Sequence, residues 1–174
     1  MVTGRLPTVT FRLLYVLVII TQERRKVVHF NITEAPSAEW TVQRVVNAFP
    51  YDTAPRYLLR DRDSIYGRSF VKRVEGMGIQ QKVISPRSPW QSPYVERLVG
   101  SIRRECLDRV IVFHEQQLRR ILESYFDYYH RVRPHRSLSH DSLIQRPVDS
   151  PDRGKVIEMP RVGGLHHHYL RQAA

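Results

Sequence analysis

Two runs of apolar, β-branched residues near the start of the chain restrict what this sequence can fold into. The run FRLLYVLVII at residues 11–20 is followed, after a short polar turn at 21–25, by KVVHFNIT at residues 26–33. Runs of this length and composition are typical of strands, and so short a turn favours antiparallel neighbours. The pattern predicts a β-hairpin. Residues 1–10 show no clear pattern, so no element is predicted there.

The middle of the chain alternates between helical and strand patterns. Apolar residues recur at helical spacing over residues 36–48, and a second, shorter helix is predicted over 67–75, before two glycines. Short apolar runs at residues 56–60 and 79–84 predict strands, the first of them buried on both faces. This order of strands and helices is typical of an α/β layer with a parallel portion.

Two further helices and a change in composition complete the chain. A loop rich in proline and serine leads to a helix that begins at Pro93, with Ser92 as its N-cap. The second helix is predicted over residues 115–130 and ends in the basic segment RVRPHR. Beyond Pro147 the sequence favours only a short strand over residues 155–159, followed by an exposed or loosely attached tail that includes the three histidines 166–168.

Composition restricts the partners and the compartment. The formal net charge is +11 and the isoelectric point about 10.3, which is typical of a protein that binds a polyanion, nucleic acid first of all. One cysteine allows no internal disulfide, which fits a reducing cytosol. The apolar run at residues 13–20 is much shorter than the roughly 20 residues that span a membrane. We expect a cytoplasmic protein that binds DNA and has no membrane partner and no small-molecule substrate.

Two acidic residues stand where rigid elements would hold them. Asp61 directly follows the strand predicted at residues 56–60, and Glu96 lies on the first turn of the helix that begins at Pro93. Two-metal phosphoryl transfer needs carboxylates from separate elements that converge on hard cations. We therefore interpret Asp61 and Glu96 as catalytic metal ligands for phosphodiester chemistry. Asp63 is the alternative to Asp61 as the metal ligand. Asp63 can also be interpreted as a turn residue whose side chain bonds its own backbone.

Basic and aromatic residues near these acids suit contacts with DNA. We expect the basic residues to hold phosphates beside the metals and along a track that leads away from them. Ordinary helix-surface charges are the alternative interpretation of the helical arginines. The aromatic pair Trp90 and Tyr94 could pack on a sugar or base, or within the loop itself. The basic residues with this expected role are Lys82, Arg87, Arg103, Arg104, Arg131, Arg133 and Arg136.

Three segments together resemble the catalytic core of the integrase and transposase superfamily that uses an Asp-Asp-Glu triad. They are RDRDSIYG, then GIQQKVISPRSPWQSPYVERLVGSIRREC, then FDYYHRVRPHRSL. The resemblance covers roughly residues 10–148. It implies a ribonuclease H-like fold, a mixed sheet of three antiparallel and two parallel strands flanked by helices. It also implies Mg²⁺ or Mn²⁺, DNA strand transfer, and a homo-oligomer on DNA ends. Asp61 and Glu96 match the second and third acids.

The first acid of that triad has no counterpart here. The family carries it on the first strand, but the segment MVTGRLPTVTF contains neither Asp nor Glu. We therefore expect an N-terminally truncated core over residues 1–148 with an incomplete first strand, followed by an extension over 149–174. Whether such a chain is an enzyme stays open, with weak strand transfer as the first expectation. The alternatives are a non-catalytic DNA-binding or multimerising remnant, and a metal-dependent nuclease of the same fold.

Overall fold

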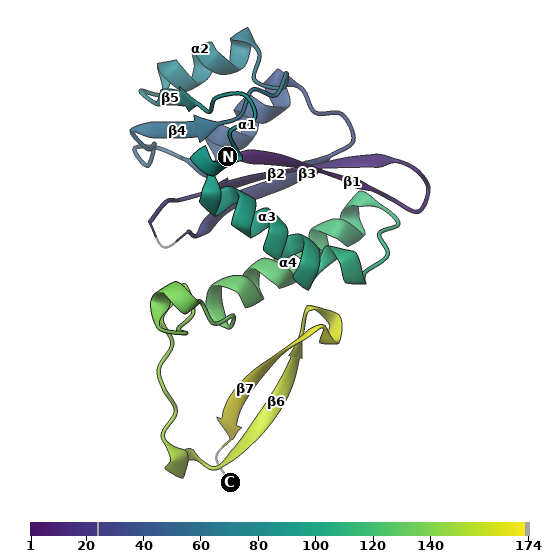
Figure 1. Ribbon diagram of the computed structural model, residues 1–174, viewed down its shortest axis with the longest axis vertical. Helices are drawn as coiled ribbons and strands as arrows, with labels where there is room; N and C mark the ends of the chain where they lie inside the picture. Colours follow the sequence, from purple (N-terminus) through teal and green to yellow (C-terminus); the bar gives the residue numbers. More distant parts are fainter. Residues whose placement is uncertain (24, 173–174) are drawn as a thin grey trace. The chain divides into compact units, whose positions relative to one another are not determined.

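The computed structural model describes residues 1–23 and 25–172, and they form two compact units (Figure 1). The first unit comprises Met1–Gly100 with Ile111–Glu115, and the remaining described residues form the second. Arg24, in the predicted turn, and the last two residues of the predicted tail lie outside the described residues. The predicted boundary between a core and an extension at residue 148 stays a prediction.

The first unit begins with three antiparallel strands, one more than the sequence predicted. They are β1 (Val2–Pro7), β2 (Leu13–Ile20) and β3 (Val27–Thr33), in the order β1-β2-β3. The hairpin of β2 and β3 confirms the prediction from the two apolar runs. The prediction of no element in residues 1–10 was wrong, because β1 pairs with β2 from Val2 opposite Val18 to Pro7 opposite Leu13, while an incomplete first strand stays a prediction.

The physical reason for this error is the composition of β1. Its sequence VTGRLP includes a glycine and a proline, which strands disfavour, and it lacks the apolar alternation that marks a strand with one buried face. The turn that follows explains why β2 starts late. The Thr8 N–H donates to the Arg12 carbonyl at 2.8 Å. Phe11 adopts a φ of 59°, so the first two residues of the apolar run belong to the turn.

Two helices pack against the sheet strands and enclose the core of the first unit (Figure 1). Helix α1 (Ala38–Ala48) begins after Ser37, whose hydroxyl accepts a hydrogen bond from the Trp40 N–H at 3.1 Å. Helix α2 (Arg68–Gly76) packs on α1 and on β5, and α1 packs on β3. The buried core residues are Met1, Leu17, Ile19, Val45, Leu58, Ile65, Tyr66, Phe70, Val74 and Ile79.

The remaining strands of the first unit run parallel, as predicted. They are β4 (Tyr57–Arg60) and β5 (Gln80–Val83), paired from Tyr57 opposite Gln80 to Arg60 opposite Val83. The expectation that β4 is buried on both faces was wrong. Leu58 is buried in the core, but Tyr57 is 46% exposed. The chain is thus a mixed α/β fold with antiparallel and parallel strands, as the resemblance implied.

Helix α3 (Pro93–Glu105) begins in the first unit and ends in the second. The second unit continues with α4 (Glu115–Arg131), whose inner face buries a row of aromatic residues. No helix among the described residues is long and apolar enough to cross a membrane. Short 3-10 turns lie at Pro89–Gln91, Leu107–Arg109, Arg136–Leu138, Pro151–Arg153 and Val162–Gly164.

The end of the second unit is more ordered than the sequence predicted. The strand predicted over 155–159 is confirmed as β6 (Lys155–Arg161), and it pairs antiparallel with β7 (His166–Gln172). The expectation of a solvated histidine tail was therefore wrong. The imidazole of His166 stacks on Tyr128 at 4.2 Å between ring centroids and lies 2.8 Å from the Glu105 carbonyl oxygen.

Candidate active site

Asp61 lies in the first unit at the end of β4, where the chain leaves the sheet. Its side chain is half-buried, and its Oδ1 accepts a hydrogen bond from the Asp63 N–H at 3.2 Å. Burial raises the pKa of Asp61, and the negative charge of Asp63 acts in the same direction, while the hydrogen bond from the Asp63 N–H opposes them. A divalent cation would favour the ionised form that this environment disfavours.

Arg60 fixes the turn that carries Asp61. Its guanidinium lies over the buried Tyr66 ring at 5.0 Å, with Phe70 behind at 5.7 Å. Arg60 also donates to the Asp61 carbonyl at 3.0 Å and to the side-chain oxygen of Gln81 at 2.9 Å. The aromatic residue at position 66 thus packs beneath the acid-bearing turn and restricts its conformations.

Asp63, the alternative to Asp61, makes the local bonds of a turn residue. Its Oδ1 accepts from the Ile65 N–H and from the Ser64 hydroxyl, both at 3.3 Å. Such bonds from an aspartate to the backbone two residues on are typical of turns. Asp61 accepts the same kind of bond from the Asp63 N–H, so these bonds do not separate the two acids, and the choice of Asp61 as the metal ligand stays a prediction.

One hydrogen bond brings the start of the chain alongside β4. Between β4 and β5, the Gln80 N–H donates to the Arg56 carbonyl, and Gln80 is paired with Tyr57, one residue further on. The Met1 nitrogen donates to the Leu59 carbonyl at 2.9 Å in the same manner. Strands β1 and β4 belong to separate sheets, but if the parallel pattern continued from this bond, Met1 would lie opposite Arg60 and Val2 opposite Asp61.

With that pattern, Val2 is the residue of β1 at which a carboxylate would come closest to Asp61. On its other side Val2 lies opposite the buried Val18 of β2. The first strand is present, and what it lacks is an acid at this position. Sequence reasoning missed this residue because β1 itself was not predicted.

Glu96 lies in the first turn of α3 with an exposed side chain. Its N–H donates to the Ser92 carbonyl at 3.2 Å, so the predicted helix start is confirmed. Among the described residues, no three His, Cys, Asp or Glu side chains are grouped so that they could hold a metal ion. Asp61 and Glu96 as a facing pair stay a prediction.

Most of the basic residues expected to contact DNA are exposed. Lys82 lies on β5, Arg87 lies in the proline-rich loop, and Arg136 lies in a 3-10 turn. On α3, Arg103 and Arg104 are also exposed. These residues are available to a polyanion, which is what their predicted role requires.

The two remaining basic residues have acidic partners within the second unit. Arg131 forms an exposed ion pair with Asp127 at 3.0 Å, one helical turn away. Arg133 is fully engaged with Glu105, with its Nη2 2.6 Å from Oε1 and its Nε 2.8 Å from Oε2. The structure therefore gives Arg133 a partner within the protein, and it is not included in the DNA contacts proposed below.

Glu105 is the centre of a network that sequence reasoning missed. Its Oε2 also accepts from the Tyr125 hydroxyl at 2.9 Å, while Arg133 Nη1 lies 3.3 Å from His135 Nδ1. Burial would raise the pKa of Glu105, but the hydrogen bonds from Arg133 and Tyr125 and the Arg133 charge together lower it. Glu105 stands at the end of α3, and no local pattern indicates a partner so far along the chain.

Comparisons with known proteins agree with this architecture. Residues 77–142 match the family model described as integrase core domain. An uncharacterized protein of insertion element IS476 from Xanthomonas euvesicatoria is 25% identical over 122 residues, which cover 70% of this chain and 35% of that protein.

A solved structure, the simian T-cell lymphotropic virus intasome in complex with PP2A regulatory subunit B56 gamma, matches 96% of this chain. The match covers 63% of the other chain, with a TM-score of 0.63 and 14% identity. This chain thus spans about a third of the insertion-element protein and less than two thirds of the matched chain in the solved structure.

Proposed function

We propose that this chain carries an integrase-type catalytic core and serves in the integration or transposition of mobile-element DNA. The mixed α/β fold, the match to an insertion-element protein and the net charge of +11 support this proposal. A surface this basic attracts a polyanion. The substrate is DNA, and the chain acts as a homo-oligomer on DNA ends.

DNA is held by phosphate contacts from the exposed basic residues. Phosphate contacts fix the position of a protein on a duplex but do not read its sequence. In the first unit they come from Lys82 and Arg87, on β5 and in the loop that leads to α3. In the second unit the exposed guanidinium groups of Arg103, Arg104 and Arg136 contribute, and Arg131 joins them if its exposed ion pair with Asp127 opens.

The observation that carries the proposed chemistry is that β1, with the sequence VTGRLP, offers no Asp or Glu to complete a metal site. Core domains of this type generally use divalent metals, and carboxylates are the ligands that Mg²⁺ and Mn²⁺ prefer. Asp61 and Glu96 are the carboxylates that this chain offers, and the neighbouring strand position is apolar. We therefore expect the chain to bind DNA well and to join or cleave strands weakly or not at all.

The test combines two assays on the purified chain. In a salt titration of duplex binding, Arg103→Ala with Arg104→Ala is expected to reduce the slope of log K against log salt by about 1.8. An unchanged slope would show that these arginines do not contact phosphate. In an oligonucleotide assay with Mg²⁺ or Mn²⁺, strand joining is expected to be weak. Robust joining that Glu96→Gln abolishes would show that the metal centre is complete.

A second function follows if the absence of a carboxylate at position 2 abolishes both strand joining and strand cleavage. The chain then acts as a DNA-binding, multimerising component without catalysis. Duplex binding with a full salt slope, together with no joining and no hydrolysis, would indicate this function. Hydrolysis without joining would instead indicate a nuclease of the same fold.

A further inference from the structure

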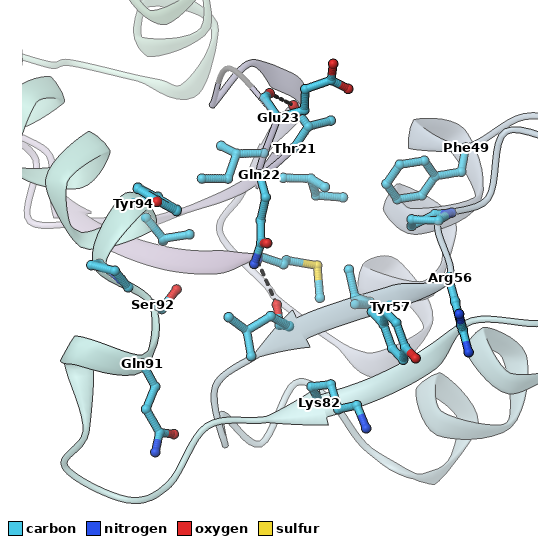
Figure 2. A pocket seen from close by; sticks show the side chains of 18 residues that line it. Thr21, Gln22, Glu23, Phe49, Arg56, Tyr57, Lys82, Gln91, Ser92 and Tyr94 are labelled. Carbon is cyan, nitrogen blue, oxygen red and sulfur yellow. Dashed lines mark hydrogen bonds between the residues drawn. The ribbon is translucent and has the colours of Figure 1, made fainter. Parts of the chain in front are cut away.

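A cavity of about 740 Å³ opens in the first unit between the end of β2 and the start of β4 (Figure 2). Its walls are mainly apolar and include Ile19, Ile20, Phe49, Leu58 and Val95. A volume of this size is typical of sites for small organic groups. None of the residues predicted as catalytic ligands lines it, so the cavity is a feature separate from Asp61 and Glu96.

One rim of the cavity carries two cations around a single aromatic ring. The Arg56 guanidinium lies 5.1 Å from the centroid of the Tyr57 ring, and the Lys82 ammonium lies 5.3 Å from the same centroid. Figure 2 shows Arg56 and Lys82 on different sides of Tyr57. Within the described part of the chain neither cation forms an ion pair with a carboxylate. Both charges are therefore available to an anionic ligand.

The opposite wall carries a second aromatic ring, Tyr94, on the first turn of α3 (Figure 2). The Arg25 guanidinium lies 4.5 Å from the centroid of this ring. Two polar side chains, Gln22 and Ser92, also line the cavity, and Glu23 is the acidic residue among its lining. The site thus combines apolar walls, two aromatic rings, a few polar groups and a cationic rim.

We propose that this cavity binds one unpaired nucleotide of a DNA strand. The base enters between the walls that carry Tyr57 and Tyr94, and the adjoining phosphate meets Arg56 and Lys82. Flat bases gain from stacking on aromatic side chains whatever their sequence, and cations beside the ring hold the backbone. The amide of Gln22 and the hydroxyl of Ser92 can bond the polar edge of the base. This inference rests on the proposed function in DNA integration.

An extended polypeptide is the other occupant that the position between two strands allows. It would pair with the ends of β2 and β4 and would need no cations at the rim. The two unpaired charges of Arg56 and Lys82 are what favour a nucleotide over a peptide. The test below separates the two, because a peptide site gives no preference for a base.

The experiment measures anisotropy of labelled duplexes with a short single-stranded overhang at the end. One overhang contains thymines, the second has the same backbone without bases, and a blunt duplex is the reference. The full chain is expected to bind the thymine overhang about fivefold or more tightly than the abasic one. Tyr57→Ala removes an aromatic wall of the cavity, and Gln22→Trp fills the cavity. Each variant is expected to abolish the preference for the thymine overhang without changing binding of the blunt duplex.

Matched controls come from exposed residues outside the cavity. Tyr51 is 98% exposed, so Tyr51→Ala removes a tyrosine of the same kind and is expected to leave the preference intact. Lys72→Ala with Arg73→Ala, on α2, removes the same charge as Arg56→Ala with Lys82→Ala. Only Arg56→Ala with Lys82→Ala is expected to weaken binding of both overhangs by more than it weakens binding of the blunt duplex.

Equal binding of the thymine and abasic overhangs by the unmodified chain would overturn the proposal. So would an equal effect of Tyr57→Ala and Tyr51→Ala. If the unmodified chain still binds the blunt duplex strongly, either of these results leaves the proposed function in DNA integration in place. If the unmodified chain binds no duplex at all, the proposed function itself is refuted.

Discussion

The ion pair of Glu105 and Arg133 is expected to contribute more to stability than any surface pair of this protein. Both side chains are about a quarter exposed, at 25% and 23%, and two guanidinium nitrogens contact the carboxylate at 2.6 and 2.8 Å. Arg133→Ala would leave Glu105 half-buried with only the Tyr125 hydroxyl as a side-chain donor. Removing one partner of such a pair leaves an uncompensated charge in a poorly solvated place.

The expected cost of Arg133→Ala in unfolding free energy lies between two limits. Breaking a fully buried pair costs about 3–5 kcal/mol, and an exposed pair contributes about 0–1 kcal/mol. Because a quarter of each side chain remains in water, Arg133→Ala is expected to cost about 2–3 kcal/mol. For a chain of this length that lowers the melting temperature by roughly 4–12 °C. Arg131→Ala is the matched control, since its pair with Asp127 has side chains 64% and 46% exposed and is expected to cost about 0.5 kcal/mol or less.

The same pair should make stability depend on pH in a defined direction. The folded state lowers the pKa of Glu105, so this group stabilises the fold above its unfolded pKa of about 4.3. The contribution is lost as the pH falls through the lower folded pKa. The difference in unfolding free energy between the unmodified chain and Arg133→Ala should therefore be full at neutral pH and shrink in acid. Urea denaturation followed by circular dichroism measures it. Equal costs for Arg133→Ala and Arg131→Ala at neutral pH would refute the reasoning.

Three further predictions concern the fold. Phe70→Ala removes a fully buried ring from the core of the first unit and should cost about 3–5 kcal/mol in urea denaturation. Gly78→Ala should cost about 1–2 kcal/mol because Gly78 has a φ of +74°, whereas Gly76→Ala, with equally open space and no positive φ, should not destabilise; equal effects would contradict this. His166→Ala removes the stack on Tyr128 and the contact with the Glu105 carbonyl, and should lower the melting temperature by several degrees.

Much of the fold could be predicted because its elements are marked by local patterns. The β2–β3 hairpin follows from two apolar runs, and the start of α3 follows from Ser92 and Pro93. Strand β1 could not be predicted, because its stability comes from pairing with β2 and not from its own residues. Strand β7 was missed for the same reason. Consecutive histidines do not predict a strand, and β7 is stabilised by its pairing with β6.

Only those features of the candidate site that depend on residues adjacent in the sequence could be predicted. Asp61 was placed at the end of a strand, and Asp63 in a turn, from the adjacent residues alone. The approach of the start of the chain to β4 depends on a hydrogen bond between Met1 and Leu59, far apart in the sequence. The role of Arg133, which follows α4, likewise depends on Glu105 at the end of α3. Long-range contacts of this kind leave no periodicity in a sequence.

Mn²⁺ binding tests the central claim most directly, namely that position 2 decides whether the acids of this core form a metal centre. Isothermal titration of Mn²⁺ into the unmodified chain and into Val2→Asp measures it. We predict little or no uptake by the unmodified chain, and uptake by Val2→Asp that either Asp61→Asn or Glu96→Gln abolishes. Stoichiometric uptake by the unmodified chain that Asp61→Asn removes, or no uptake by a folded Val2→Asp chain, would contradict the account.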